Sequence, residues 1–457
     1  MNQTYSLKQK YVQFLKILIP ILITQVTMSL MTFFDTTMSG HASAADLAGA
    51  AIGSSIWVPV QTGLSGILMG ITPIVSQLVG RGEHRKVGYH VMQGLWLAVA
   101  VGIAILLIGG LVLSPLLNSM NLEPKVHHVA FYFLVAISTG IIPLFGYTII
   151  RSFIDSLGQT RVSMLITLVS LPINVGAGYV LIFGRLGFPR LGGIGSGIAT
   201  AFTYWCIFAL ALLIVHKREP FAGYGIFRKL HGVSLAKWKE LMKIGVPMGF
   251  AIFFETAVFA AVTLLMSRFD TLTIAAHQAA NNFASTLYMI PLSICLALTI
   301  LVGYEAGANR LKDAKQYGIL GVGTAVALSL FTAVILMVFR SKVAGLYSNE
   351  PEVIVLITHF LVYAIFFQIS DAIATPVQGV LRGYKDVNPG FWISLLAYWI
   401  IGLPLGFVLA NYTGQGPYGY WVGLITGLGV AAILLLRRLV VIQRRMAQGT
   451  AGKPAEG

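Results

Sequence analysis

The sequence predicts an all-α integral membrane protein, with twelve transmembrane helices in two pseudo-symmetric six-helix bundles around a central cavity. Three observations support this class. The chain is 56% hydrophobic and only 10% charged, whereas about a quarter of the residues of an ordinary globular domain are charged. Its uncharged runs are long enough to cross a bilayer, which takes about 20 apolar residues in a helix. Short sequence matches also recur between the two halves at a nearly constant spacing.

The uncharged runs give the spans in chain order. Only Glu255 interrupts the seventh run. The last run is 50 residues long and holds two crossings, because the stretch Asn411–Pro417 is a dense turn signal inside it. The total is therefore twelve. We expect spans within 17–34, 47–80, 87–122, 126–150, 162–184, 191–216, 244–267, 271–304, 316–339, 353–370 and 387–436.

The spans divide the chain into four parts. Residues 1–216 form an N-terminal six-helix lobe, and residues 244–445 form a C-terminal six-helix lobe. Between them, residues 217–243 carry seven Lys and Arg residues together with several helix formers. We expect this connection to be an amphipathic linker on the inner membrane surface. Residues 446–457 are predicted to be a flexible cytoplasmic tail.

The basic residues predict the orientation. Of the 31 Lys and Arg residues, 25 fall in the segments that share a side with the N-terminus. Short loops rich in Lys and Arg stay in the cytoplasm, so both termini are predicted to be cytoplasmic in a multi-pass protein of the cell (inner) membrane. The same distribution argues against nucleic-acid binding despite the net charge of +15, because the basic residues lie in the connections between spans.

The two halves repeat at a shift of 227 residues. The motif Lys16–Pro20 matches Lys243–Pro247, and two further pairs follow at the same shift, Thr72 with Thr299 and Gly80 with Gly307. Six helices per half is an even number, so both halves enter the membrane from the same side. Such repeats are related by an axis along the membrane normal and move by rocking around a site between them.

Three carboxylates lie within predicted helices or at a helix end: Asp35, Glu255 and Asp371. An acidic side chain at membrane depth costs about 2.5–3.5 kcal/mol on insertion scales, so it marks a functional site by default. The structural alternative is a buried polar bond that holds two helices together. Glu305 lies close to a basic loop, and we expect it to form an ion pair with Arg310 or Lys312.

Neutral polar residues accompany these carboxylates. Gln278, Asn282 and Ser285 recur at i, i+4 and i+7, so they share one helix face, and Tyr288 continues the row. This face is predicted to line a wet cavity, with contact to another helix as the alternative. In the first half, Asn174 and Thr200 are the polar groups that could join Asp35.

The sequence resembles the multidrug and toxic compound extrusion (MATE) family, and its NorM-like branch in particular. The residues that carry the resemblance are the segment FFDTTMSG at 33–40, Glu255, Asp371 and the element GVLRGYKDV at 379–387. The resemblance covers residues 10–440, nearly the whole chain. It implies a multidrug efflux antiporter that is coupled to Na⁺ or H⁺ and exports lipophilic organic cations by alternating access.

The resemblance also implies roles for individual residues. Glu255, Asp371 and Tyr288 match the coupling-cation region of the C-terminal lobe, with Glu255 and Asp371 as Na⁺ ligands if sodium is the coupling ion. A second cluster, for a cation or a proton, lies in the N-terminal lobe: Asp35, Asn174 and Thr200. Two positions depart from the family pattern, since Gly178 stands where Asn or Asp is usual and Phe367 where some relatives have Tyr.

The chemistry agrees with these implications. Hard cations bind carboxylate and neutral oxygens, and aromatic cavities attract flat organic cations. The expected partners are cationic drugs and dyes, the coupling cation and the lipid bilayer, for a monomer with no cofactor. The choice between Na⁺ and H⁺ stays open.

Two other functions compete with efflux. A flippase for lipids or lipid-linked oligosaccharides is the alternative; its anionic cargo would require Arg or Lys in the middle of the spans, and the uncharged runs contain none. A membrane-embedded enzyme is the third possibility and the least favoured. Prenyl or phosphoryl transferases need clustered Asp residues to bind Mg²⁺, and the sequence has no such motif at a predicted membrane face.

The charge count makes a topology prediction. A reporter fused after Gln448 should be cytoplasmic, and a reporter inserted at Gly414 should be external, because 25 of the 31 Lys and Arg residues lie in segments on the side of the N-terminus and only six on the side of Gly414. Protease protection or a compartment-specific reporter enzyme measures both positions. The reverse pattern would contradict the charge count and the helix count together.

Overall fold

The structure is a computed structural model that describes residues 1 and 3–449, and within this part of the chain all regular structure is helical. Eleven helical segments are long and apolar enough to cross a membrane. The pair α5 (Pro124–Ser138) and α6 (Ile141–Ser156) is bent by 47° and passes the same test as one span. The predicted number of twelve spans is thereby confirmed, and the predicted turn at 411–417 separates the last two.

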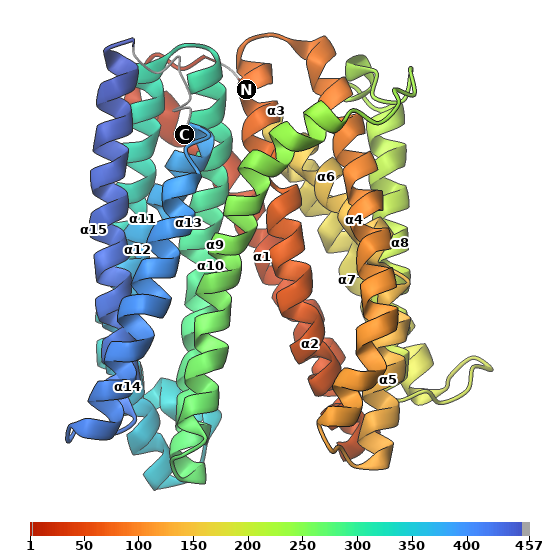
Figure 1. Cartoon of the computed structure of the whole chain (residues 1–457), viewed down its shortest axis with the longest axis vertical. Coiled ribbons are helices and arrows are strands. Elements are labelled where there is room, and N and C mark those ends of the chain that lie inside the picture. The colour runs from red at the N-terminus through yellow and green to blue at the C-terminus, as the bar shows by residue number, and fades with distance from the viewer. Residues whose placement is uncertain (2, 450–457) are drawn as a thin grey trace. The chain divides into compact units, whose positions relative to one another are not determined.

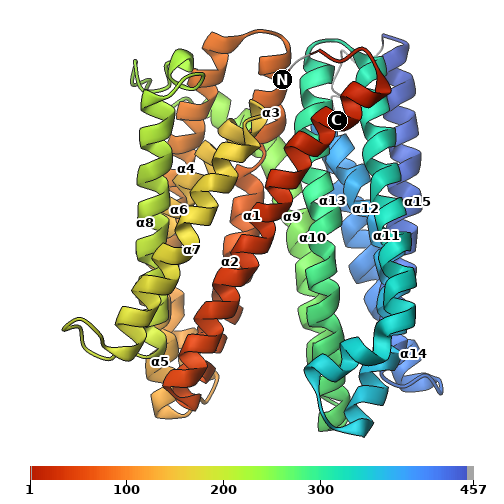
Figure 2. The same cartoon turned by 180° about the vertical axis from the view of Figure 1, so that it is seen from behind.

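The described residues form two compact units (Figures 1 and 2). The first comprises Met1 and 19–249. Besides α5 and α6 it contains the following elements: most of α1 (Leu7–Ala42), then α2 (Ala44–Leu68), α3 (Ile71–Gly80), α4 (His84–Ser119), α7 (Thr160–Phe183), α8 (Gly193–Lys217), the short 3₁₀ helix η1 (Ala222–Tyr224) and the first half of α9 (Leu235–Met266). Helix α2 packs mainly on α5, and α7 packs mainly on α8.

The second unit comprises 3–18 and 250–449 of the described residues. It contains the rest of α1 and α9 and six further helical segments: α10 (Thr271–Gly307), α11 (Leu311–Tyr347), α12 (Pro351–Gly383), α13 (Asn388–Ser394), α14 (Leu403–Tyr412) and α15 (Tyr418–Ala447). A π-helix, η2 (Leu395–Gly402), joins α13 to α14 within one span. Helix α12 lies at the centre of this unit, against α10, α11 and α15.

The repeat is visible in the way each unit is packed. Helices α3 and α10 end at the paired glycines Gly80 and Gly307. In the first unit, the Ser156 hydroxyl at the end of α6 donates to the Thr72 carbonyl of α3 over 3.3 Å. In the second unit, the Thr299 hydroxyl of α10 donates to the Gly379 carbonyl of α12 over 3.1 Å. The second and fourth spans are therefore joined at the same level in both repeats.

The boundaries differ from the sequence prediction at three places. Residues 3–18 group with the second unit, because Lys10 Nζ lies 2.9 Å from Asp313 Oδ1 and the hydroxyls of Thr4 and Tyr317 hydrogen-bond. The last part of the predicted linker 217–243 belongs to the helix of the seventh span, because α9 already begins at Leu235; the position of the linker on the inner membrane surface stays a prediction. The predicted tail 446–457 begins inside α15, and its residues 450–457 lie outside the described part.

The span ends are also longer than the uncharged runs suggested. Arg151 lies inside α6, and Arg382 lies inside α12, although both were expected in loops. Each is partnered within its own unit: Arg151 with Asp155 over 3.5 Å, and Arg382 with the side chain of Gln378 over 3.1 Å. A charged residue with a partner inside the protein can continue a helix where an unpartnered one would end the apolar run.

The close contact between α10 and α12 gives a stability prediction. A Cβ added to Gly379 would lie 2.7 Å from the Cα of Cys295, so Gly379→Ala should lower the free energy of unfolding by about 1–3 kcal/mol through overpacking. A thermal unfolding series on the purified protein measures this change. Gly429→Ala is the matched control, since a Cβ there meets nothing within 4 Å and a helical Gly→Ala change by itself stabilises by about 1 kcal/mol. Equal melting temperatures for both variants would contradict the close packing.

Candidate functional site

Glu255 is the first member of a polar cluster in the second unit. It projects from α9 toward α12 and α13, where Gln378 Nε2 donates to its Oε1 over 2.6 Å and the Ser394 hydroxyl lies 3.4 Å from the same oxygen. Gln378 in turn accepts a hydrogen bond from the Arg382 guanidinium over 3.1 Å. The carboxylate is thus linked through one amide to a buried positive charge, which supplies part of the stabilisation that water would give.

Asp371 is the second carboxylate of this cluster. Only 3% of the residue is exposed. The Thr375 hydroxyl, one turn further along α12, donates to Asp371 Oδ1 over 2.7 Å. Its other oxygen, Oδ2, is buried and has no hydrogen-bond partner among the described residues. An unsatisfied buried acceptor is costly and calls for an explanation, such as an ion or a proton that binds there.

Neutral oxygens and the backbone geometry complete the cluster. Glu255 and Asp371 are close enough to repel each other electrostatically. The phenols of Tyr288 on α10 and Tyr398 on η2 lie within electrostatic range of both. Tyr398 is part of the π-helical segment, a geometry that occurs frequently at functional sites. Two carboxylates and several hydroxyls of this unit therefore interact electrostatically. The role of Glu255, Asp371 and Tyr288 as a coupling-cation site stays a prediction.

This donor set suits a monovalent cation better than a transition metal. No group of three or more His, Cys, Asp or Glu side chains that could hold a metal ion occurs within residues 1 and 3–449. Hydroxyl, amide and carboxylate oxygens are instead the ligands of hard cations. Either a hard cation or a proton would relieve the repulsion between the two carboxylates.

Sequence reasoning missed several members of the cluster. Asp371, Thr375, Gln378 and Arg382 fall at i, i+4, i+7 and i+11 of α12, and all four are buried. This spacing places them on one helix face and could have been read from the sequence. The uncharged run 353–370 ends just before Asp371, so the predicted span did not include this face. Ser394 and Tyr398 carried no comparable signal, since only the tertiary fold brings α13 and η2 to α9.

The first unit contains a smaller cluster around Asp35. The Thr200 hydroxyl of α8 donates to Asp35 Oδ2 over 3.2 Å, and Asn174 Nδ2 of α7 lies 3.5 Å from the Thr200 oxygen. Asp35 Oδ1 and Asn174 Oδ1 are buried without hydrogen-bond partners among the described residues. The structure therefore brings together the three residues that the sequence singled out, and it leaves two acceptors open.

The two departures from the family pattern have structural explanations. A Cβ on the buried residue Gly178 would lie 2.8 Å from the terminal methyl of Met38, so Met38 fills the space that a larger residue would need. Phe367 packs edge-on against Phe259 and Trp421, with ring centroids 5.4 and 6.3 Å apart. It belongs to an aromatic cluster and adds no oxygen to the carboxylate cluster.

The predicted polar face of α10 lies on the surface of the second unit. Gln278, Asn282 and Ser285 are all exposed. Asn282 accepts a hydrogen bond from the Tyr347 hydroxyl over 3.0 Å, and Ser285 donates to a carbonyl of its own helix over 2.8 Å. These side chains are accessible rather than buried against another helix of their unit, and their role as cavity lining stays a prediction.

Two further acidic residues have a structural role. Glu305 is fully buried and lies 2.5 Å from Arg310 Nε, which confirms the predicted ion pair. Asp155 was not predicted as a buried group. Its Oδ1 accepts a hydrogen bond from Ser163 over 2.6 Å, and its Oδ2 lies 3.5 Å from Arg151. Both carboxylates already have cationic partners, unlike Asp371.

The comparisons with known proteins now identify the family. A sequence model described as MatE matches residues 20–180 and again residues 247–408. The two matched ranges begin 227 residues apart, which is the shift of the internal repeat. The chain belongs to the MatE family. Members of this family are transporters and not enzymes, so the chain is a transporter whose fold provides two related six-span units.

The relatives agree along nearly their whole length. A protein of Halalkalibacterium halodurans named "Probable multidrug resistance protein NorM" is 58% identical over 97% of this chain and 97% of its own length. A protein of Bacillus subtilis with the same name is 54% identical over 98% and 99%. Among solved structures, the outward-facing conformation of a multidrug resistance MATE family transporter superimposes with a TM-score of 0.88 at 15% identity, over 97% of both chains. This likeness shows the shared fold.

The hydrogen-bond chain from Arg382 to Glu255 gives a prediction for the transporter. Gln378→Leu should reduce efflux roughly tenfold to a hundredfold with the protein still folded, because a hydrogen bond to a charged group contributes about 1.5–3 kcal/mol. Dye efflux from energised vesicles measures it. Gln368→Leu is the matched control on the same helix, since Gln368 is equally buried but donates only to the Ala284 carbonyl. Equal losses in the two variants would indicate a packing role alone.

Proposed function

We propose that this transporter is a cation-coupled multidrug efflux antiporter that exports lipophilic organic cations in exchange for Na⁺ or H⁺ by alternating access. Its family and the printed names of its relatives, both "Probable multidrug resistance protein NorM", support export of drugs. The observation that carries the coupling is Asp371, a buried carboxylate with one open oxygen beside a second carboxylate, Glu255.

The proposed coupling follows from charge balance. Without a bound cation or proton, the cluster of Glu255 and Asp371 carries negative charge that its hydrogen bonds do not neutralise. This charge attracts a cationic drug bound to the transporter. When a coupling cation or proton binds there, the charge is neutralised and the drug is released. Coupling then requires only that the drug and the cation favour opposite conformations or exclude each other.

The clusters of the two units have different parts in the proposal. The cluster in the second unit has two carboxylates, and we assign the coupling cation to it. The cluster of Asp35, Asn174 and Thr200 has one carboxylate with two open acceptor atoms nearby. We assign to it a proton or a second cation. Both assignments rest on the same argument: a carboxylate within a membrane span is costly, so its presence there indicates a function.

The remaining parts of the proposal concern the setting. We propose that both termini lie in the cytoplasm, because most Lys and Arg residues fall in the loops on that side, and that the transporter acts in the cell membrane as a monomer. The exposed polar face of Gln278, Asn282 and Ser285 is proposed to line the drug path. Aromatic side chains near that path would bind flat cations through their π-faces.

The carboxylates provide the decisive test. Glu255→Gln and Asp371→Asn should each abolish coupled efflux of ethidium, because the amides keep the shape and the hydrogen bonding but hold neither a charge nor a titratable proton. The protein should still reach the membrane in normal amounts, since neutralising a carboxylate removes an insertion penalty. Fluorescence of ethidium-loaded vesicles gives the rate, with a Na⁺ pulse in one arm and a pH jump in the other. Wild-type rates with normal ion dependence in the double variant would overturn the coupling assignment.

The same assay separates efflux from the alternative. Asp386→Asn is a matched control, because Asp386 forms a paired ion bridge with Arg438 over 2.6 and 2.7 Å and has no place in the proposed site. It should preserve the ion dependence of efflux. Purified protein that moves lipid-linked sugars across vesicles while ignoring ethidium would favour the flippase instead.

A further inference from the structure

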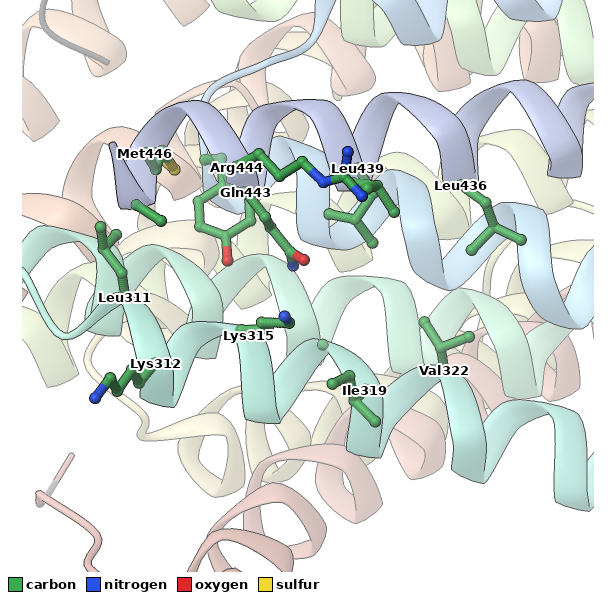
Figure 3. Close-up of a pocket in the computed structure, with 14 residues that line it drawn as sticks. Leu311, Lys312, Lys315, Ile319, Val322, Leu436, Leu439, Gln443, Arg444 and Met446 are labelled. Carbon is green, nitrogen blue, oxygen red and sulfur yellow. The ribbon is translucent and has the colours of Figure 1, made fainter. Parts of the chain in front are cut away.

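A pocket of about 670 Å³ lies between α11 and α15 in the second unit, away from the carboxylate cluster (Figure 3). The first three turns of α11 form one wall and the last three turns of α15 form the other, with Tyr384 at the base. Its volume is in the range of ordinary ligand sites. The function proposed above makes no use of this pocket.

One end of the pocket is cationic. It is lined by Lys312 and Lys315 from α11 and by Arg444 from α15. In the view of Figure 3 the Lys315 ammonium lies between the two helices, whereas the Lys312 ammonium points away from α15. Within the described residues none of the three forms an ion pair. The acidic groups on the adjoining elements are occupied elsewhere, because Asp313 pairs with Lys10 and Arg310, and Asp386 pairs with Arg438. Among residues 1 and 3–449, no acidic side chain lines the space beside these three basic residues.

Neutral donors lie at the same end. Gln443 lines the pocket and hydrogen-bonds Tyr384. Burial raises the pKa of Tyr384 to about 12, so its hydroxyl stays protonated at neutral pH. The N-terminal end of α11, which begins at Leu311, also presents the positive end of its helix dipole. All of these groups favour an anion with several acceptor oxygens.

The other end of the pocket is apolar. Beyond the cations its lining consists of small and aliphatic residues: Gly318, Ile319, Val322, Leu436, Leu439 and Val440. At 1.5 Å per residue, Val322 lies about 15 Å along the helix axis from Lys312. Ile319 and Val440 are 64% and 46% exposed, so this end is open on the outer surface of the helix pair. The pocket therefore changes from cationic to hydrocarbon-like along the axis of two membrane-spanning helices.

We infer that this pocket binds an anionic phospholipid of the surrounding membrane, with its phosphate on Lys312, Lys315 and Arg444 and an acyl chain along Ile319 and Val440. Basic pockets between transmembrane helices bind acidic lipid headgroups. A free phosphate would use the cations but leave the apolar end empty. A cationic drug would be repelled at the basic end.

The test measures lipid binding to the full-length protein in mild detergent. Native mass spectrometry counts bound phosphatidylglycerol and phosphatidylcholine at equal concentrations. Wild type should bind one phosphatidylglycerol at least tenfold more tightly than phosphatidylcholine. The variant Lys312→Gln, Lys315→Gln, Arg444→Gln should lose this preference, because each basic residue near an anionic lipid contributes about fivefold in affinity.

A matched variant removes three exposed basic residues outside the pocket: Lys217→Gln, Arg218→Gln and Lys229→Gln. It removes three positive charges, as the pocket variant does, and should keep the preference for phosphatidylglycerol over phosphatidylcholine. Lys315→Glu alone is a second variant, in case the triple variant expresses poorly, and it should weaken phosphatidylglycerol binding in the same direction. Ile319→Ser should weaken long-chain but not short-chain phosphatidylglycerol.

Three outcomes would overturn the inference. The first is equal binding of both lipids to wild type, which would show contact with hydrocarbon only. The second is an equal loss of preference in the pocket variant and in the matched variant, which would show a general charge effect. The third is displacement by inorganic phosphate as effective as that by long-chain phosphatidylglycerol, which would show a free-anion site. None of these outcomes bears on the carboxylates, so the efflux proposal is tested separately.

Discussion

The cost of an unsatisfied polar group in hydrocarbon is the constraint on which this structure depends. Within a bilayer every donor and acceptor must find its partner inside the protein. Glu255 meets this demand through Gln378 and Ser394, and Gln378 passes the interaction on to Arg382. Asp371 has a hydrogen-bond partner for only one of its oxygens, Oδ1, which accepts from Thr375. Asp371 Oδ2 is one of several buried polar atoms without a partner among the described residues, and Asp35 Oδ1 is another carboxylate oxygen of this kind. An open carboxylate oxygen is where a cation or proton has most to gain.

Close helix contacts hold the cluster in place. The Gly379 backbone lies directly against Cys295, and a Cβ on Gly383 would lie 2.9 Å from the amide nitrogen of Gly303. Helices without side chains at the contact can approach closely enough for a hydroxyl such as that of Thr299 to reach a neighbouring carbonyl. This contact fixes α12 against α10 and so fixes the height of Asp371 relative to Tyr288. The equivalent contact in the first unit joins α3 to α6 by one side-chain hydrogen bond.

The two repeats share a fold but have diverged in their polar interior. The second unit contains the hydrogen-bonded chain of Glu255, Gln378 and Arg382, and Asp371 with Thr375 on the same face of α12. The first contains Asp35 with two neutral neighbours, and Met38 fills the space beside Gly178. Family membership explains the common framework. The chemistry of each interior depends on single residues, which is why the proposed functions of the two clusters differ.

The sequence by itself determined the class, the number of spans and the repeat, because burial in a bilayer requires long uncharged runs and Lys and Arg interrupt them. It also singled out Asp35, Glu255 and Asp371, since an isolated charge in an apolar run is conspicuous. Only the tertiary structure decided which neutral groups surround them. Ser394 and Tyr398 are more than 130 residues from Glu255 in the chain, and no periodicity relates them to it. Helix lengths were underestimated for a different reason: Arg382 and Arg151 lie inside their helices, where Gln378 and Asp155 one turn away on the same helix are their polar partners.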